Sequence, residues 1–119
     1  MNILIYMSKK NFDTQKAERF FKERRIPVQV MDLSPKGKHR LGERELMLFA
    51  GREGIAALID REDKKVKDHP ACYNSLESAL KEAVLENPWL LRSPIVRCGS
   101  KVTVGYQPEI WESWLKAQA

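Results

Sequence analysis

The first 33 residues place two short apolar stretches on either side of one amphipathic stretch, and this order constrains the fold more than any other feature. Residues 2–7 form a nearly continuous apolar run, which is typical of a strand covered on both faces and central in a sheet. Apolar residues then recur at helical spacing, which predicts a surface helix with one buried stripe. That stripe consists of Ala17, Phe20 and Phe21. Either Asn11 or Asp13 can cap this helix.

Pro27 ends the helix, and the residues that follow it mix apolar and polar side chains as a second strand does. A strand, a helix and a strand in this order predict a βαβ unit, whose right-handed crossover makes the two strands parallel. Residues 34–40 contain Pro35, Gly37 and three basic residues, so we expect a loop there.

The middle of the chain favours helices. Helix resumes near Gly42, and Gly51 and Gly54 interrupt its apolar pattern before a short helical turn around residues 55–59. Residues 60–68 are highly charged and show no usable periodicity. Ser75 is expected to cap the clearest helix of the chain, which Asn87-Pro88 ends. The expected apolar face of that helix consists of Leu76, Ala79, Leu80, Ala83 and Val84.

Two short β-branched runs, residues 94–97 and 101–104, flank Cys98-Gly99-Ser100 and predict an antiparallel hairpin. Pro108 suits the first turn of a last helix. Its apolar face consists of Ile110, Trp111, Trp114 and Leu115, with both tryptophans expected in the core rather than in an exposed partner patch. The order is βαβ, a helical middle and ββα. It predicts an α/β, thioredoxin-like fold, with a mixed four-stranded sheet flanked by helices.

The length of 119 residues fits a single domain over residues 1–119. The longest apolar runs fall far below the roughly 18 residues that cross a bilayer, and no apolar signal core begins the chain. We therefore expect a cytoplasmic protein without membrane association. The two cysteines, Cys72 and Cys98, fit a reducing compartment, although a single bridge between them stays open.

The net charge of +5 is unevenly distributed. Residues 1–40 carry ten Lys/Arg against four Asp/Glu, whereas the rest of the chain carries eleven against twelve. Such a surplus fits an anionic ligand, an acidic protein surface or nucleic acid. We do not expect direct nucleic-acid binding, because no aromatic-interleaved basic stripe or nucleic-acid motif accompanies the charge.

Several segments match one family pattern over nearly the whole chain. The C-terminal segments are Glu86-Asn87-Pro88, Leu90-Leu91, Pro94-Ile95-Val96, Gly99, Gly105-Tyr106 and Trp111. The N-terminal ones are Tyr6, Lys10 and residues 13–19. Together they resemble the arsenate reductase ArsC/Spx family of thioredoxin-like proteins. The resemblance implies the ArsC-type helical insert between the second and third strands, and thiol redox chemistry at a cysteine between the first strand and the first helix.

In this resemblance the family's nucleophile aligns with Asn11, and residues 8–14 contain no cysteine. A thiolate at that position is stabilised by unpaired backbone N–H groups and by the positive end of the helix dipole. Asparagine can cap the helix, but it cannot attack arsenate or a disulfide. A shift of one residue would place Phe12 there, with the same consequence.

The resemblance also implies arginines that hold an oxyanion. Arg61 matches the first of them, Ser93 stands at the second position with Arg92 just before it, and Tyr106-Gln107 stands at the third. A vacated pocket around the missing nucleophile therefore becomes the candidate binding site. Its candidate residues are Lys10, Asn11, Phe12, Arg61, Arg92, Ser93 and Pro94, the last resembling the family's cis-proline. We assign no catalytic residue, no metal ligand and no cofactor, with glutathione as the one candidate cofactor.

Each singled-out residue also has an ordinary structural interpretation. Lys9 and Lys10 form either a remnant anion site at the helix N-terminus or solvated loop charges. Cys72 and Cys98 are expected to be ordinary thiols, because neither is predicted at a helix N-terminus with a basic neighbour. His39 and His69 are expected to be solvated loop residues, since their spacing matches no metal-ligand motif.

The sequence thus predicts an ArsC/Spx-family protein that lacks thiol redox catalysis and acts by binding a protein partner or a small oxyanion. One alternative is an arsenate or glutathione-coupled thiol reductase that uses Cys72 or Cys98. A further alternative is a transcription regulator that binds RNA polymerase, because Tyr106 resembles the Spx-like branch of the family.

Overall fold

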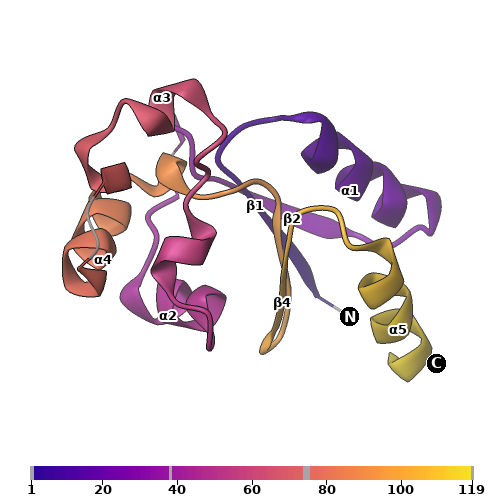
Figure 1. Cartoon of the computed structure of the whole chain (residues 1–119). Coiled ribbons are helices and arrows are strands. Elements are labelled where there is room, and N and C mark those ends of the chain that lie inside the picture. The colour runs from indigo at the N-terminus through magenta and orange to yellow at the C-terminus, as the bar shows by residue number, and fades with distance from the viewer. Residues whose placement is uncertain (1, 38, 74–75, 119) are drawn as a thin grey trace.

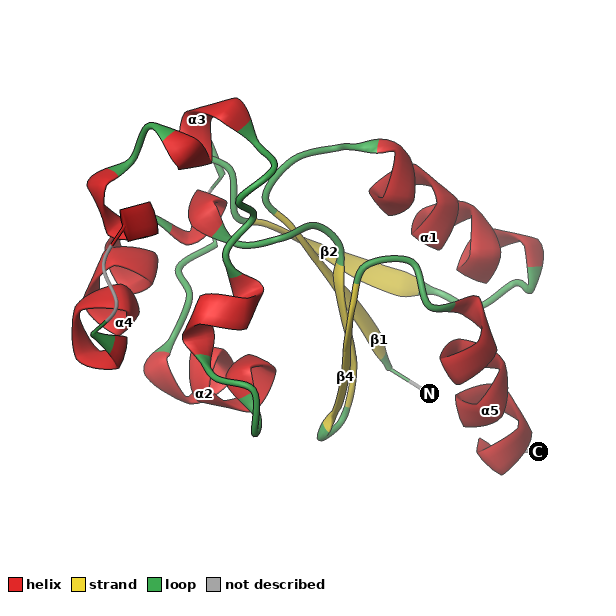
Figure 2. Cartoon of the chain, viewed as in Figure 1, coloured by secondary structure: helices red, strands yellow, loops and turns green. Residues whose placement is uncertain are grey.

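The computed structural model of the chain describes residues 2–37, 39–73 and 76–118. A mixed four-stranded sheet with the strand order β2-β1-β3-β4 forms its centre (Figure 2). The strands are β1 (Ile3–Met7), β2 (Val28–Asp32), β3 (Ile95–Cys98) and β4 (Lys101–Val104). Strand β1 pairs parallel with β2 and antiparallel with β3, and β3 pairs antiparallel with β4. The predicted βαβ unit, the central first strand and the hairpin are confirmed.

Helices α1 (Phe12–Glu23) and α5 (Pro108–Gln118) lie together on one face of the sheet (Figure 1). Strand residues Ile3, Ile5 and Val96 point toward them and belong to one hydrophobic cluster with both helices. At its centre lies Trp111, which is fully buried and donates a hydrogen bond from Nε1 to Thr103 Oγ1 at 2.8 Å. The prediction that the tryptophans of the last helix are core residues is confirmed.

The segment between β2 and β3 packs on the opposite face as a helical insert (Figure 1). It contains α2 (Glu43–Ala50), η1 (Ile55–Leu58), α3 (Lys64–Lys67), η2 (Pro70–Tyr73), α4 (Glu77–Glu86) and η3 (Pro88–Leu90). Its buried side chains meet the opposite side of the sheet around Tyr6 and Ile95. No helix within the described residues has the length and apolar character needed to span a bilayer.

The insert differs from the prediction at two places. The charged stretch 60–68 contains α3, where the Asp63 carboxylate accepts hydrogen bonds from the backbone N–H groups of Lys65 and Val66. Only one side chain of α3 is buried, so the sequence contains no apolar periodicity from which this helix could be predicted. In α4, Leu76 is the N-cap and is 65% exposed, so the prediction that it lies on the buried face is wrong. The predicted cap Ser75 lies outside the described residues.

Candidate functional site

The N-terminus of α1 meets the loop before β3, and the side chain of Asn11 joins them. As the N-cap of α1, its Oδ1 accepts a hydrogen bond from the Thr14 N–H at 2.8 Å. Its Nδ2 donates to the Ser93 carbonyl at 2.9 Å. The amide therefore satisfies one unpaired N–H group of the helix terminus and also holds the loop in place.

Two buried hydroxyl groups lie behind this amide. Ser93 Oγ donates to the Lys9 carbonyl at 2.8 Å, and it lies 2.6 Å from Thr14 Oγ1. Thr14 is 0% exposed and Ser93 is 5% exposed. The Ser93–Pro94 peptide bond is cis, as the family resemblance implied. Each polar side-chain group of this network has a protein partner, so the network fixes the loop before β3 against the N-terminus of α1.

Lys9, just before α1, forms ion pairs with two carboxylates from the insert, Asp60 and Asp63. Partial burial disfavours the charged ammonium, but the hydrogen bonds to both carboxylates outweigh it and raise the pKa of Lys9. The hydrogen bond from Lys9 in turn lowers the pKa of Asp63. Lys9 is therefore neither a solvated loop charge nor a free anion-binding group, because its charge is already neutralised.

A small pocket of about 220 Å³ opens at this end of α1. Four of its lining residues are acidic: Asp13, Asp60, Glu62 and Asp63. Its two basic residues are Lys9 and Arg92, alongside Asn11 and Ser93. Since Lys9 is already paired, the carboxylates dominate the charge at the opening of this pocket, which we call its mouth. Such a mouth repels a small oxyanion more than it attracts one.

The structure brings three of the predicted site residues together, namely Asn11, Arg92 and Ser93. The other four do not line the pocket. Arg61 turns toward η2 and donates a hydrogen bond to the Cys72 carbonyl at 2.7 Å. Pro94 is buried, and its carbonyl accepts the Gly105 N–H at 2.8 Å. Lys10 and Phe12 point outward rather than lining the pocket.

Phe12 belongs to an exposed aromatic surface beside the pocket. Its ring is 74% exposed, although it directly follows the N-cap of α1. The Lys16 ammonium lies 5.2 Å from the ring centroids of both Phe12 and Tyr106. Tyr106 is itself 38% exposed. Two exposed aromatic rings bridged by one cation form a surface suited to contact with another macromolecule.

Neither cysteine lines this pocket, and both are free thiols in the structure. Cys98 is the last residue of β3. Cys72 lies in η2, and the Arg61 guanidinium approaches its Sγ to 3.5 Å. The prediction was that Cys72 does not lie at a helix N-terminus with a basic neighbour; the structure places it inside η2 but supplies a basic neighbour, Arg61, from another part of the insert.

Both histidines pack against aromatic rings, so the prediction that they are solvated loop residues is wrong. His39 lies 5.7 Å from Tyr6 between ring centroids, and its Nε2 lies 3.5 Å from a Glu45 oxygen. His69 lies 5.6 Å from Trp89. Within the described residues, no group of three metal-ligating side chains comes together.

Sequence reasoning missed Thr14 and the pairing of Lys9 with Asp60 and Asp63. The carboxylates stand 51 and 54 residues after Lys9, and no local pattern links groups so far apart. Thr14, three residues after the N-cap, carried a weak signal, because a hydroxyl at that place can bond the capping side chain.

Replacing Asp63 by asparagine is expected to remove part of the pH dependence of stability. The pKa of Asp63 is lowered in the folded state, so its ion pair stabilises the protein above the unfolded pKa and is lost as the pH falls below about 4. Asparagine still caps α3. Unfolding by urea between pH 2 and pH 7 should therefore show a difference between the two proteins that is largest near neutral pH. An equal difference at all pH values would contradict the role of the ion pair.

Comparisons with known proteins agree with this architecture. A family model described as the ArsC family matches residues 6–114. An arsenate reductase from Vibrio cholerae is 22% identical with a TM-score of 0.75, and the match covers 95% of this chain and 97% of that one. An arsenate reductase (ArsC) related protein from Brucella melitensis is 22% identical with a TM-score of 0.67, covering 98% and 96%. No curated protein matches the chain. The α/β, thioredoxin-like fold is confirmed.

Proposed function

The chain belongs to the ArsC family, and from this premise we propose that it acts by binding a protein partner and not by thiol redox catalysis. The observation that carries the proposal is the presence of asparagine at position 11 and the hydrogen bonding of its side-chain amide. A side-chain amide stands at the N-terminus of α1, where the family resemblance expects the reactive thiol. Its oxygen accepts a hydrogen bond from Thr14, and its nitrogen donates one to Ser93. The group supports the fold of the loop and offers no nucleophile.

The electrostatics of the mouth favour a protein partner over a small oxyanion. An oxyanion site needs unpaired cations or free N–H groups. Here Lys9 is paired with two carboxylates and the Thr14 N–H is bound to Asn11, so Arg92 is the one unpaired cation among the described lining residues, against four acidic side chains in the same lining. Phe12, in contrast, exposes a large apolar surface next to the mouth. An aromatic ring of this kind is a typical anchor residue in protein interfaces.

A thiol reductase that uses Cys72 is the second candidate function. The observation in its favour is the Arg61 guanidinium, which lies 3.5 Å from Cys72 Sγ and so places a cation beside the sulfur. We rank it second because Cys72 lies in η2, a short 3-10 helix, and not at the N-terminus of α1.

The redox part of the proposal is tested by steady-state arsenate reduction with glutathione and glutaredoxin, and separately with thioredoxin. We expect the unmodified protein to give no rate above that of protein-free buffer. A known arsenate reductase serves as the positive control. Turnover that disappears in Cys72→Ser but persists in Cys98→Ser would contradict the proposal and favour the second candidate.

The binding part is tested with two kinds of probe. In NMR titrations, arsenate, phosphate and glutathione should leave the signals of Asn11, Arg92 and Ser93 unchanged. The RNA polymerase α subunit is the first protein probe, because Tyr106 resembles the Spx-like branch. If it is the partner, Phe12→Ala should weaken binding about tenfold or more. Met47→Ala, which removes a side chain 51% exposed on α2, is the matched control and should change binding little.

A further inference from the structure

Strand β4 forms one edge of the sheet, and its pairing with β3 determines which backbone groups face outward. The Gly105 N–H donates to the Pro94 carbonyl at 2.8 Å. Hydrogen-bonded and non-hydrogen-bonded residue pairs alternate along antiparallel strands. Thr103 therefore bonds to β3, whereas the N–H and C=O groups of Val102 and Val104 point away from the sheet.

Most of these outward groups have no partner among the described residues. The Gln107 side chain donates a hydrogen bond to the Val104 carbonyl at 3.3 Å. The Val102 N–H, the Val102 C=O and the Val104 N–H bond to no group in the part of the chain that the structure describes. Unpaired groups on an edge strand are the donors and acceptors that an added strand uses.

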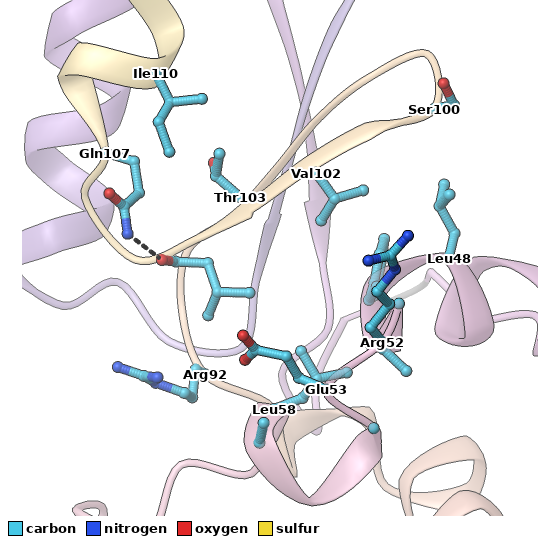
Figure 3. A pocket seen from close by; sticks show the side chains of 16 residues that line it. Leu48, Arg52, Glu53, Leu58, Arg92, Ser100, Val102, Thr103, Gln107 and Ile110 are labelled. Atoms are coloured by element: carbon cyan, nitrogen blue, oxygen red, sulfur yellow. Dashed lines mark hydrogen bonds between the residues drawn. The ribbon is translucent and has the colours of Figure 1, made fainter.

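A groove of about 530 Å³ runs over this edge (Figure 3). Leu48 of α2 and Leu58 of η1 lie on one side of it, and Ile110 of α5 lies on the other. Val102 and Thr103 both line the groove, although successive side chains of a strand point to opposite faces of the sheet. One groove can touch both faces only where it passes over the edge of the strand. Its position therefore matches that of an additional strand.

The charges along the groove favour an acidic ligand. Arg52 and Arg92 line it and make no ion pair with a described residue, and Glu53 is the only acidic side chain in the lining. The whole chain carries a net charge of +5. Complementary charge accelerates the encounter with an acidic partner and disfavours a basic one.

We propose that this groove binds an extended, acidic segment of a partner protein, which pairs with β4 as a fifth strand of the sheet and places apolar side chains against Leu48 and Leu58. The site goes beyond the proposed function, because only Arg92 lines both this groove and the pocket at Asn11. A second copy of the chain fits less well. Each copy would bring Arg52 and Arg92 to the shared edge and carries a net charge of +5, so like charges oppose this pairing.

The proposal is tested by NMR with an acetylated and amidated eight-residue peptide in which valine and glutamate alternate. Added to the full chain, the peptide should slow hydrogen exchange of the Val102 and Val104 amides about tenfold or more, because both gain hydrogen bonds. A matched peptide with lysine in place of glutamate should bind at least about tenfold more weakly. Arg52→Glu should weaken binding of the glutamate peptide, whereas Arg44→Glu makes the same charge change on α2 outside the groove and should not.

Three results would overturn the proposal. The first is no shift of groove signals at about 1 mM peptide, which corresponds to less than about 4 kcal/mol of binding free energy. The second is binding without slower exchange at Val102. The third is slower exchange at Val102 when the protein alone is concentrated, which would assign the edge to a second copy. None of these readouts involves Asn11 or Phe12, so the failure of this proposal and of the proposed function can be distinguished.

Discussion

Replacing Trp111 by alanine is expected to lower the free energy of unfolding by about 4 kcal/mol. The indole is fully buried, and its centroid lies 5.2 Å from those of Phe20 and Phe21 in α1. The substitution removes these ring contacts, leaves a cavity between α1 and α5, and leaves the buried hydroxyl of Thr103 without its donor. Urea unfolding monitored by circular dichroism measures the effect. The comparison is valid if the dependence of the unfolding free energy on urea concentration has the same slope in both proteins.

Two further variants separate the contributions to this loss. Trp111→Phe keeps an aromatic ring in the cluster but removes the Nε1 donor, so it should cost less than the alanine variant, about 1–3 kcal/mol. Ile110→Ala, one residue earlier on the same helix and 41% exposed, should change the free energy by less than about 1 kcal/mol. Equal losses for Trp111→Ala and Ile110→Ala would show that the packing of Trp111 does not hold the two helices together.

The elements of the fold could be predicted because each carries a local signal. The apolar run in β1, the stripe of Phe20 and Phe21 and the hairpin around Gly99 follow from periodicity and turn chemistry, and the structure confirms all three. The short helix α3 could not be predicted in this way. Its N-terminus is capped by Asp63 and Val66 is its only buried side chain, so its sequence shows no apolar periodicity.

The candidate site was less predictable, because its geometry depends on contacts between distant segments. Asn11 as a cap was visible from its place before the helix pattern, but its bond to Ser93 spans 82 residues. Arg61 was matched to an anion-holding position by resemblance, whereas the structure directs its guanidinium to Cys72. A family pattern aligns residues along the chain, but the direction of a long, flexible side chain depends on the partners that the fold brings near it.

Replacing Asn11 by cysteine, in a chain whose two native cysteines are changed to serine, is expected to create a thiol whose pKa lies below the ordinary value of about 8.5. The new sulfur would stand at the N-cap of the twelve-residue helix α1, where the Thr14 N–H can donate to a thiolate and the helix dipole favours negative charge. The pH dependence of the alkylation rate with iodoacetamide gives this pKa directly. Asn11→Ser in the same background is the unreactive control.

The thiol pKa of this variant decides between two possibilities. Either the scaffold lacks only the reactive sulfur, or it also lacks the electrostatic environment that stabilises a thiolate. Four carboxylates line the pocket and oppose a thiolate, although Lys9 pairs with two of them. Asp13→Asn, added to the Asn11→Cys variant, should therefore lower the pKa of the thiol further, because it removes one of the unpaired charges. A thiol pKa at or above about 8.5 would contradict the expectation. It would mean that the carboxylates destabilise a thiolate more than the N-terminus of α1 stabilises it. Restoring the sulfur alone could then not restore the family's chemistry.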